Sequence, residues 1–250
     1  MESQITSDMN KSLLHPVTSA EIQDALFQML PTKSPGPDGI NALFYQKFWH
    51  IIGNDASVAI FEFLQSGNLL KSINYTHITL ILKVKAPDTM TQFRPISLYN
   101  VLYKIISKVL ANHLKSVLDH VISGSQSAFV PGRLITDNFL VAFEALHYLK
   151  TKRQGQSTHM VVKLDMSKTY DRVEWIFLKS MMARMEFCAR WVNLVMQCIQ
   201  TVSYSVILNG PPVGYIRPSK GIRQGDPLSP YLFLICAEGF TALLNSATVS

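Results

Sequence analysis

The sequence predicts an α+β fold that is rich in helices at the front and carries a small antiparallel sheet. Two observations indicate this class. Apolar residues recur at helical spacing through much of the chain, most clearly between residues 99 and 122. The β-branched run from Tyr75 to Val84 is typical of a strand, and two apolar segments joined at Asn209-Gly210 are typical of a hairpin.

The first clear helix begins at a capping box. Thr18 is followed three residues later by Glu21, so each side chain can bond the other's backbone amide, and apolar residues then recur at helical spacing. This pattern stops at Pro31. The segment KSPGPDG, residues 33–39, is too rich in proline and glycine for regular structure and predicts a loop.

Three helical patterns dominate the chain between residues 41 and 149. The first runs from about Asn41 to Gln65, with a break expected at Gly53 and a C-cap at Gly67. The second is the long amphipathic stretch from Tyr99 to Ile122. The third covers Ile135 to Leu149.

The last part of the chain is expected to alternate strands and helices. A short apolar run predicts a buried strand, and two longer amphipathic runs predict helices before the hairpin and a third after it. In chain order these are the strand Met160 to Leu164, the helices Trp175 to Met185 and Trp191 to Val202, the hairpin of Tyr204 to Asn209 with Gly214 to Arg217, and the helix Tyr231 to Leu244.

Composition places the chain among globular intracellular proteins. Its 250 residues are 48% hydrophobic and 16% charged, which allows a sizeable core. Cys188, Cys198 and Cys236 lie far apart and form no CxxC pair, so neither a disulfide framework nor a zinc knuckle is indicated. No secretory signal is expected, and no apolar run approaches the roughly 20 residues of a membrane span. We expect a nuclear or cytoplasmic location and no membrane partner.

The net charge of +6 is unevenly distributed. Residues 1–70 hold 3 Lys or Arg against 7 Asp or Glu, whereas residues 71–250 hold 20 against 10. The basic excess of the second segment suits a polyphosphate backbone and favours nucleic acid among possible partners. Many basic proteins have no such ligand, so charge alone does not decide the matter.

The stretch VVKLDMSKTYDRVEW, residues 161–175, contains the most informative carboxylate. Asp165 stands where the predicted buried strand meets a polar turn, with Lys163 and Lys168 nearby, an arrangement that suits metal-dependent phosphoryl transfer. The alternative is an ordinary turn or cap residue. Tyr170 could pack flat against a sugar, or it could anchor the turn in the core.

Two further segments offer groups that can hold a nucleotide. The loop GIRQGDP, residues 221–227, places Gln224 and Gly225 just before a helix, where backbone can approach a ligand closely. Lys83 and Arg94 flank another loop and could hold a triphosphate through charge-assisted hydrogen bonds. An ordinary loop and helix start, and solvated surface cations, are the respective alternatives.

Five blocks of sequence together narrow the choice. KSPGPDGI, FRPISL, QSAFVPGRLITDN, VKLDMSKTYDRVEW and GIRQGDPLSPYLF occur in the order of one family's motifs. From about Pro31 to Leu244 the chain resembles a non-LTR (LINE-type) retrotransposon reverse transcriptase, and most closely the elements abundant in plant genomes. The resemblance implies the fingers and a partial palm of a right-hand polymerase, with residues 1–158 as the N-terminal and fingers-like region and residues 159–250 as the palm part.

The resemblance also implies a function and a set of partners. The family is an RNA-directed DNA polymerase that uses two magnesium ions, an RNA template, a DNA primer and deoxynucleoside triphosphates. Asp165 matches the first catalytic aspartate, which binds magnesium together with the Met166 carbonyl. The nucleotide-binding positions are Tyr170 as the aromatic steric gate, Gln224 and Gly225 as the loop at the incoming nucleotide, and Lys83 and Arg94 as the fingers residues at the triphosphate.

Three departures from the family pattern are present. Thr169 stands where alanine is usual, and its β-branched side chain is expected to crowd the nucleotide pocket. Leu82 stands where proline is common. The family's Ala-Asp-Asp motif is missing, because no two adjacent acids occur and Glu238 is the only acid after Asp226. Two metal ions need several carboxylates, so we expect a fragment truncated before this motif and inactive alone.

Two alternatives to a polymerase fragment remain open. The first is a non-enzymatic nucleic-acid-binding remnant of a decayed element, which the basic excess favours. The second is a maturase-type relative of group II introns, which shares the blocks around Asp165 and Gln224. Missing palm strands would leave a sheet edge and an apolar face uncovered, so self-association or poor solubility is expected. The oligomeric state itself is not predicted.

Overall fold

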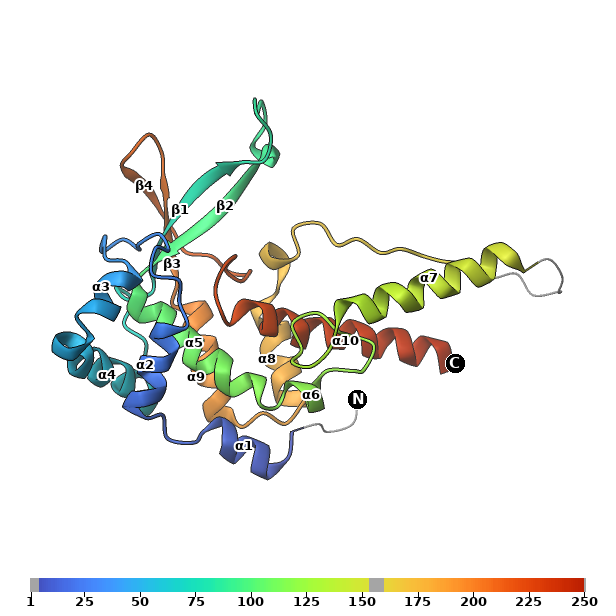
Figure 1. Cartoon of the computed structure of the whole chain (residues 1–250), viewed down its shortest axis with the longest axis horizontal. Helices are drawn as coiled ribbons and strands as arrows, with labels where there is room; N and C mark the ends of the chain where they lie inside the picture. Colours follow the sequence, from blue (N-terminus) through green and yellow to red (C-terminus); the bar gives the residue numbers. More distant parts are fainter. Residues whose placement is uncertain (1–4, 153–159, 250) are drawn as a thin grey trace.

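Figure 1 shows the computed structural model of the chain, which describes residues 5–152 and 160–249. Packed helices form a body that carries a small sheet at one end, while one helix extends away from the body at the other. The helices are α1 (Ser7–Leu13), α2 (Ser19–Phe27), α3 (Ala42–Lys47), α4 (Trp49–Ser66), α5 (Val101–Lys115), α6 (Leu118–Val121), α7 (Ile135–Thr151), α8 (Trp175–Arg184), α9 (Ala189–Gln200) and α10 (Ser229–Val249). The strands are β1 (Tyr75–Leu82), β2 (Phe93–Tyr99), β3 (Ser203–Ile207) and β4 (Pro212–Ile216), and short 3-10 turns lie at Met90–Gln92 and Tyr170–Arg172.

The sheet has the order β2-β1-β3-β4 and is mixed. β1 pairs antiparallel with β2, and β3 pairs antiparallel with β4, but β1 and β3 run parallel, with Tyr75 opposite Ser203. The α+β class with a small sheet is therefore confirmed, while the sheet, expected to be antiparallel, contains one parallel pair. Parallel neighbours need a long crossover, and here the chain from β2 through α9 supplies it.

The core is centred on α5. This helix buries residues on most of its faces and packs against α1, α2, α4 and α10, so the long amphipathic pattern becomes the central helix of the body. Tyr103 on α5 and Trp191 on α9 are among its largest fully buried side chains. The predicted capping box of α2 is confirmed, because Thr18 and Glu21 exchange side-chain to backbone hydrogen bonds.

Two helix boundaries differ from the expectation. The break predicted at Gly53 is absent: α4 continues through it, and Gly53 lets the ring of Trp49 pack closely, since a Cβ there would lie 2.8 Å from Trp49 Cε2. The long helix predicted up to Ile122 is divided, because α5 ends at Lys115 and the short α6 follows it. At this end the Ser116 hydroxyl donates to the His113 carbonyl at 2.7 Å, a side-chain hydrogen bond that competes with the backbone pattern of a helix. The predicted C-cap at Gly67 is confirmed by its φ of 70°.

The buried strand predicted at Met160 to Leu164 is wrong. Residues 160–166 have no regular structure and are exposed, Met160 by 84% and Val162 by 62%. Apolar and β-branched residues form a strand only where a neighbouring strand accepts their hydrogen bonds, and none of the strands in the described residues lies beside this segment.

Helix α7 is formed as predicted but buries none of its residues. Its exposed apolar side chains include Phe139, Val141 and Phe143, and the exposed segment 160–166 adds more apolar surface. The predicted self-association remains a prediction, and this is the surface from which it would arise. Along the described ranges, no helix combines the length and the apolar character needed to cross a bilayer.

The proline- and glycine-rich loop at residues 33–39 packs against the start of α5. A Cβ on Gly36 would lie 2.4 Å from the Asn100 backbone nitrogen, so only glycine allows this approach. The contact places Ser34 where its carbonyl accepts a hydrogen bond from Lys104 Nζ at 2.9 Å. The loop is therefore fixed to the helix that carries the core.

Replacing Gly36 with alanine should destabilise the protein, because the new methyl group would meet rigid backbone. We expect the free energy of unfolding in urea to fall by about 2 kcal/mol. Gly124→Ala is the matched control, since a Cβ there meets nothing within 4 Å. Equal stability of the Gly36→Ala variant and the unmodified protein would contradict the close packing.

Candidate functional site

A large cleft brings together most of the residues that the sequence singled out. Its volume is about 1390 Å³. The β1–β2 hairpin, the 168–171 turn and the loop before α10 all contribute to its walls. The predicted site residues on its surface are Lys83, Arg94, Tyr170, Gln224 and Gly225.

Asp165 and Met166 are not among the residues lining this cleft. Both lie on the exposed segment 160–166, which forms no strand that would direct their groups into the cleft. The Met166 carbonyl accepts a hydrogen bond of 2.5 Å from the hydroxyl of Thr169. Among the described residues, the carboxylate that does line the cleft is Asp171.

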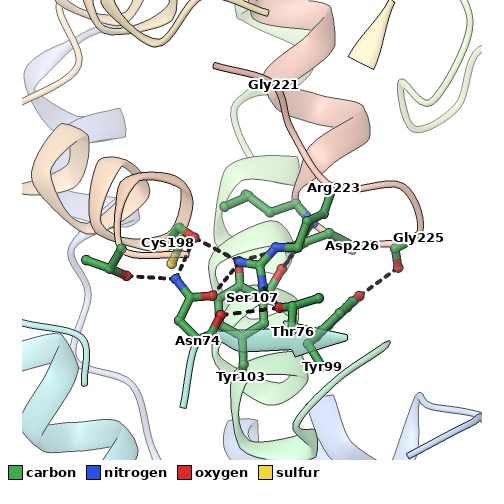
Figure 2. Close-up of polar contacts among 12 residues, drawn as sticks. Asn74, Thr76, Tyr99, Tyr103, Ser107, Cys198, Gly221, Arg223, Gly225 and Asp226 are labelled. Carbon is green, nitrogen blue, oxygen red and sulfur yellow. Dashed lines mark hydrogen bonds and ion pairs between the residues drawn. The ribbon is translucent and has the colours of Figure 1, made fainter. Parts of the chain in front are cut away.

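The loop at residues 221–226 is anchored by its own buried arginine, Arg223. Figure 2 shows Arg223 enclosed by polar groups from β1 and α9. Its guanidinium donates to Asn74 Oδ1 at 2.6 Å and to Thr76 Oγ1 at 3.2 Å. A further bond of 2.9 Å reaches the carbonyl of Cys198, and the ring of Tyr103 lies 3.8 Å from the guanidinium carbon.

Asp226 balances this buried charge. Its carboxylate lies 3.5 Å from Arg223 Nε and is only 4% exposed. It accepts hydrogen bonds from the Tyr103 hydroxyl at 2.8 Å, from the Ser107 hydroxyl and from the Leu228 amide at 2.9 Å. Burial, with a smaller contribution from the Asp226 charge, raises the pKa of Tyr103 well above its usual value, so the phenol stays a donor.

Further bonds fix both ends of the loop. The Tyr99 hydroxyl donates to the Gly225 carbonyl at 2.8 Å, which is visible in Figure 2, and Gly225 has a φ of 90° that favours glycine. At the other end, the Gly221 amide donates to the Val173 carbonyl at 2.7 Å, and Trp175 Nε1 donates to the Gly221 carbonyl at 2.8 Å. The loop is thereby held beside the turn that carries Tyr170.

Sequence reasoning missed the two charged residues of this loop. The sequence pattern assigned a role only to Gln224 and Gly225 of this loop and none to Arg223 or Asp226. The signal available in the sequence was the three-residue spacing of two opposite charges, Arg223 and Asp226, but only their burial decides what that spacing means. Arg223 and Asp226 position Gln224 and Gly225 and do not themselves line the cleft.

Tyr170 is half-buried. The two alternatives for its ring, a surface open to a ligand and an anchor in the core, each describe part of its environment. Its ring packs against Phe233 with centroids 5.7 Å apart, and it also lines the cleft. Its carbonyl accepts the amide of Ile222 at 2.9 Å, so the turn is attached to the glycine loop. Burial raises the pKa of the Tyr170 hydroxyl.

The cations of the cleft differ in their attachments. Lys83 Nζ donates to the Thr91 carbonyl at 2.9 Å, which closes the hairpin tip. Lys104 lines the cleft but is largely buried, 8% exposed, with its Nζ 5.3 Å from the centre of the Tyr99 ring. Burial, reinforced by the nearby charge of Lys33, lowers the pKa of Lys104.

The residues present do not fit a pair of magnesium ions. Across residues 5–152 and 160–249, no group of three or more His, Cys, Asp or Glu side chains converges in a way that could hold a metal. Asp226 is engaged by Arg223, Tyr103 and Ser107, and Asp165 stands outside the cleft. One carboxylate facing the cleft is too few for two divalent ions.

Fold and cleft together define an α+β domain with a basic, aromatic-lined cleft beside a mixed sheet. The chain belongs to the reverse transcriptase family, because the family described as reverse transcriptase (RNA-dependent DNA polymerase) matches residues 81–249. Members of this family in general use two metal ions, and residues 5–152 and 160–249 show no group of acids that could hold them.

Similar proteins support the same family and narrow it to retrotransposon reverse transcriptases. The chain is 33% identical over 242 residues to the transposon TX1 uncharacterized 149 kDa protein of Xenopus laevis, covering 96% of this chain and 18% of that protein. It is 27% identical over 216 residues to the retrovirus-related Pol polyprotein from type-2 retrotransposable element R2DM of Drosophila melanogaster, covering 86% and 20%. It is 25% identical over 226 residues to the corresponding type-1 R2 polyprotein of Nasonia vitripennis, covering 89% and 21%.

These relatives confirm the resemblance to non-LTR retrotransposon reverse transcriptases. The chain spans about a fifth of the length of each of these relatives. Family membership therefore applies to this domain, and the activities of the longer proteins do not transfer with it.

The buried pair should behave as a coupled unit. Asp226→Asn leaves the Arg223 charge buried without its partner, and we expect the free energy of unfolding to fall by about 3–5 kcal/mol. Arg223→Met should be destabilising for the converse reason. In a double-mutant cycle measured by urea unfolding, the combined cost should be smaller than the sum by about 1–3 kcal/mol. Additive costs would show that the two charges act independently.

Proposed function

We propose that this chain is the nucleotide- and template-binding part of an RNA-directed DNA polymerase from a non-LTR retroelement. The observation that carries the proposal is the cleft, which gathers Lys83, Arg94, Tyr170, Gln224 and Gly225 from separate segments. Its partners would be an RNA template, a DNA primer and deoxynucleoside triphosphates. Residues 1–158 would act as the fingers-like region and residues 159–250 as the palm part.

Each residue of the cleft has a role that its position supports. Lys83 and Arg94 stand on the β1–β2 hairpin and would bind the triphosphate, Arg94 through its two parallel N–H groups. Tyr170, braced by Phe233, would lie against the sugar and exclude a ribose 2′-hydroxyl. Gln224 offers a donor and an acceptor beside Gly225, whose lack of a side chain lets a nucleotide approach the backbone.

Binding and catalysis are separate matters in this chain. Positioning of a nucleotide needs only the cations, aromatic rings and loop of the cleft, whereas nucleotidyl transfer by two-metal catalysis needs several converging carboxylates. We propose that Asp165, with the Met166 carbonyl, is the metal-binding position retained from the family. Without further acids beside it, the chain would bind substrates and fail to join them.

A second candidate function is salt-sensitive binding of nucleic acid without any chemistry. The basic excess of residues 71–250 and the cations of the cleft favour this reading. It differs from the first proposal in one measurable respect, because a remnant of this kind would bind RNA without selecting deoxynucleoside triphosphates.

Primer extension tests catalytic competence. Purified chain supplied with an RNA template, an annealed DNA primer, deoxynucleoside triphosphates and magnesium is expected to give no extension, because the carboxylates are too few. Retained binding of the primer–template, weakening as salt rises, would show that the protein is folded and that only the chemistry is missing. Robust synthesis that disappears in the Asp165→Asn variant would contradict the proposed incompetence.

Thr169 tests the shape of the nucleotide site. Thr169→Ala and Thr169→Ser both remove the methyl group that crowds the cleft, and each should tighten binding of a deoxynucleoside triphosphate by about fourfold, the equivalent of one methyl group. The serine variant keeps the hydroxyl that donates to the Met166 carbonyl. If alanine tightens binding and serine does not, that hydrogen bond, and not crowding, limits the site.

A further inference from the structure

The charges of the cleft are strongly one-sided. Among the described residues, five cations line it, Lys33, Lys83, Arg94, Lys104 and Lys168, together with one carboxylate, Asp171. Cations in such numbers repel one another across a confined space and favour an anion that brings several negative charges at once. A polyphosphate has that charge density, whereas a single carboxylate ligand does not.

Several of these cations are free to bind a ligand. Within the described ranges, the side chains of Lys33, Arg94 and Lys168 have neither a hydrogen bond nor an ion pair. Lys104 gives one of its N–H groups to the Ser34 carbonyl, which leaves two donors on a buried ammonium. A buried cation near the Tyr99 ring is held in place before any ligand arrives.

The acids near the cleft cannot convert it into a metal site. The Asp226 oxygens are occupied by Arg223, Tyr103 and Ser107, and the side chain is buried. Asp165 lies on the exposed segment outside the cleft. The lysine and arginine side chains that line the cleft are therefore the groups available to neutralise a bound polyanion.

Because the cleft offers many cations but too few free carboxylates to bind a metal ion, we infer that it binds the polyphosphate of a nucleoside triphosphate without a divalent cation. The inference rests on the proposed nucleotide-binding function and adds the counterions: Lys33, Lys104 and Lys168 join Lys83 and Arg94 in place of metal. Magnesium already bound to the triphosphate reduces its negative charge, so it weakens the attraction and does not strengthen it.

The aromatic surfaces of the cleft favour a nucleoside over a bare polyphosphate. Tyr170 offers a braced ring face, and Phe129 lines the cleft with its side chain 58% exposed. Phe129 also has a φ of 61°, a conformation that bulky residues rarely adopt, so the surrounding loop holds an aromatic ring there at a cost in backbone strain. Bases stack on exposed aromatic rings of this kind.

Isothermal titration with dATP distinguishes the possibilities. Purified full chain is titrated in EDTA and again with magnesium. The expected result is binding in EDTA that magnesium leaves unchanged or weakens. A strengthening by magnesium of roughly tenfold or more, about 1.4 kcal/mol, overturns the inference while leaving the proposed function standing. Absence of dATP binding in both buffers overturns the proposed function and the inference together.

Charge variants and partial ligands complete the test. Lys168→Gln should weaken dATP binding in EDTA several-fold, and Asp171→Asn should strengthen it, because one removes a cation and the other the repelling acid. Lys179→Gln is the matched control, since Lys179 is exposed on α8 and does not line the cleft. An equal effect of Lys179→Gln would show a general charge effect and overturn the assignment of the cations.

Inorganic triphosphate and deoxyadenosine separate the two halves of the ligand. Triphosphate alone should bind more weakly than dATP, and Phe129→Ala should reduce that difference without changing triphosphate binding. Equal affinity for triphosphate and dATP would overturn the nucleoside part of the inference and identify a polyanion site only. Stronger binding of deoxyadenosine than of triphosphate would overturn the role of the cations.

Discussion

The buried ion pair of Arg223 and Asp226 is the interaction on which the cleft depends. Removing two charges from water costs several kcal/mol for each ion, and here hydrogen bonds to nearly every side of the pair offset that cost. Those bonds come from Asn74 before β1, from Tyr103 on α5 and from the end of α9, segments far apart in the sequence. The pair therefore joins the sheet, the central helix and the glycine loop at one point.

A loop held in this way can offer backbone to a ligand without losing its shape. Its two glycines adopt positive φ, one end is bonded to Tyr99 and the other to Val173 and Trp175. Such fixed geometry lowers the entropic cost of binding, since little remains to be ordered when the ligand arrives. The chain belongs to the reverse transcriptase family and holds this loop rigidly, whereas no group of acids that could bind a metal converges in the described residues.

Local patterns in the sequence predicted most of the helices and the hairpin. The capping box at Thr18, the C-cap at Gly67 and the amphipathic pattern of α5 rest on contacts within a few residues, so they can be read without the fold. The strand at residues 160–164 was wrong because a strand exists only with a partner, and partners are set by distant segments. The parallel pairing of β1 with β3 was missed for the same reason.

The sequence by itself determined the family and the order of the motifs, because these follow from residue identity and spacing, and the resemblance they carry supplied the candidate nucleotide-binding positions. It also showed that no adjacent acids are present. Only the tertiary structure decided which side chains face the cleft: it buried Arg223 and Asp226 beneath it, left Asp165 outside it and placed Lys33, Lys104 and Lys168 on its walls. The burial of a side chain and the direction in which it points depend on packing between distant segments, which no local sequence pattern specifies.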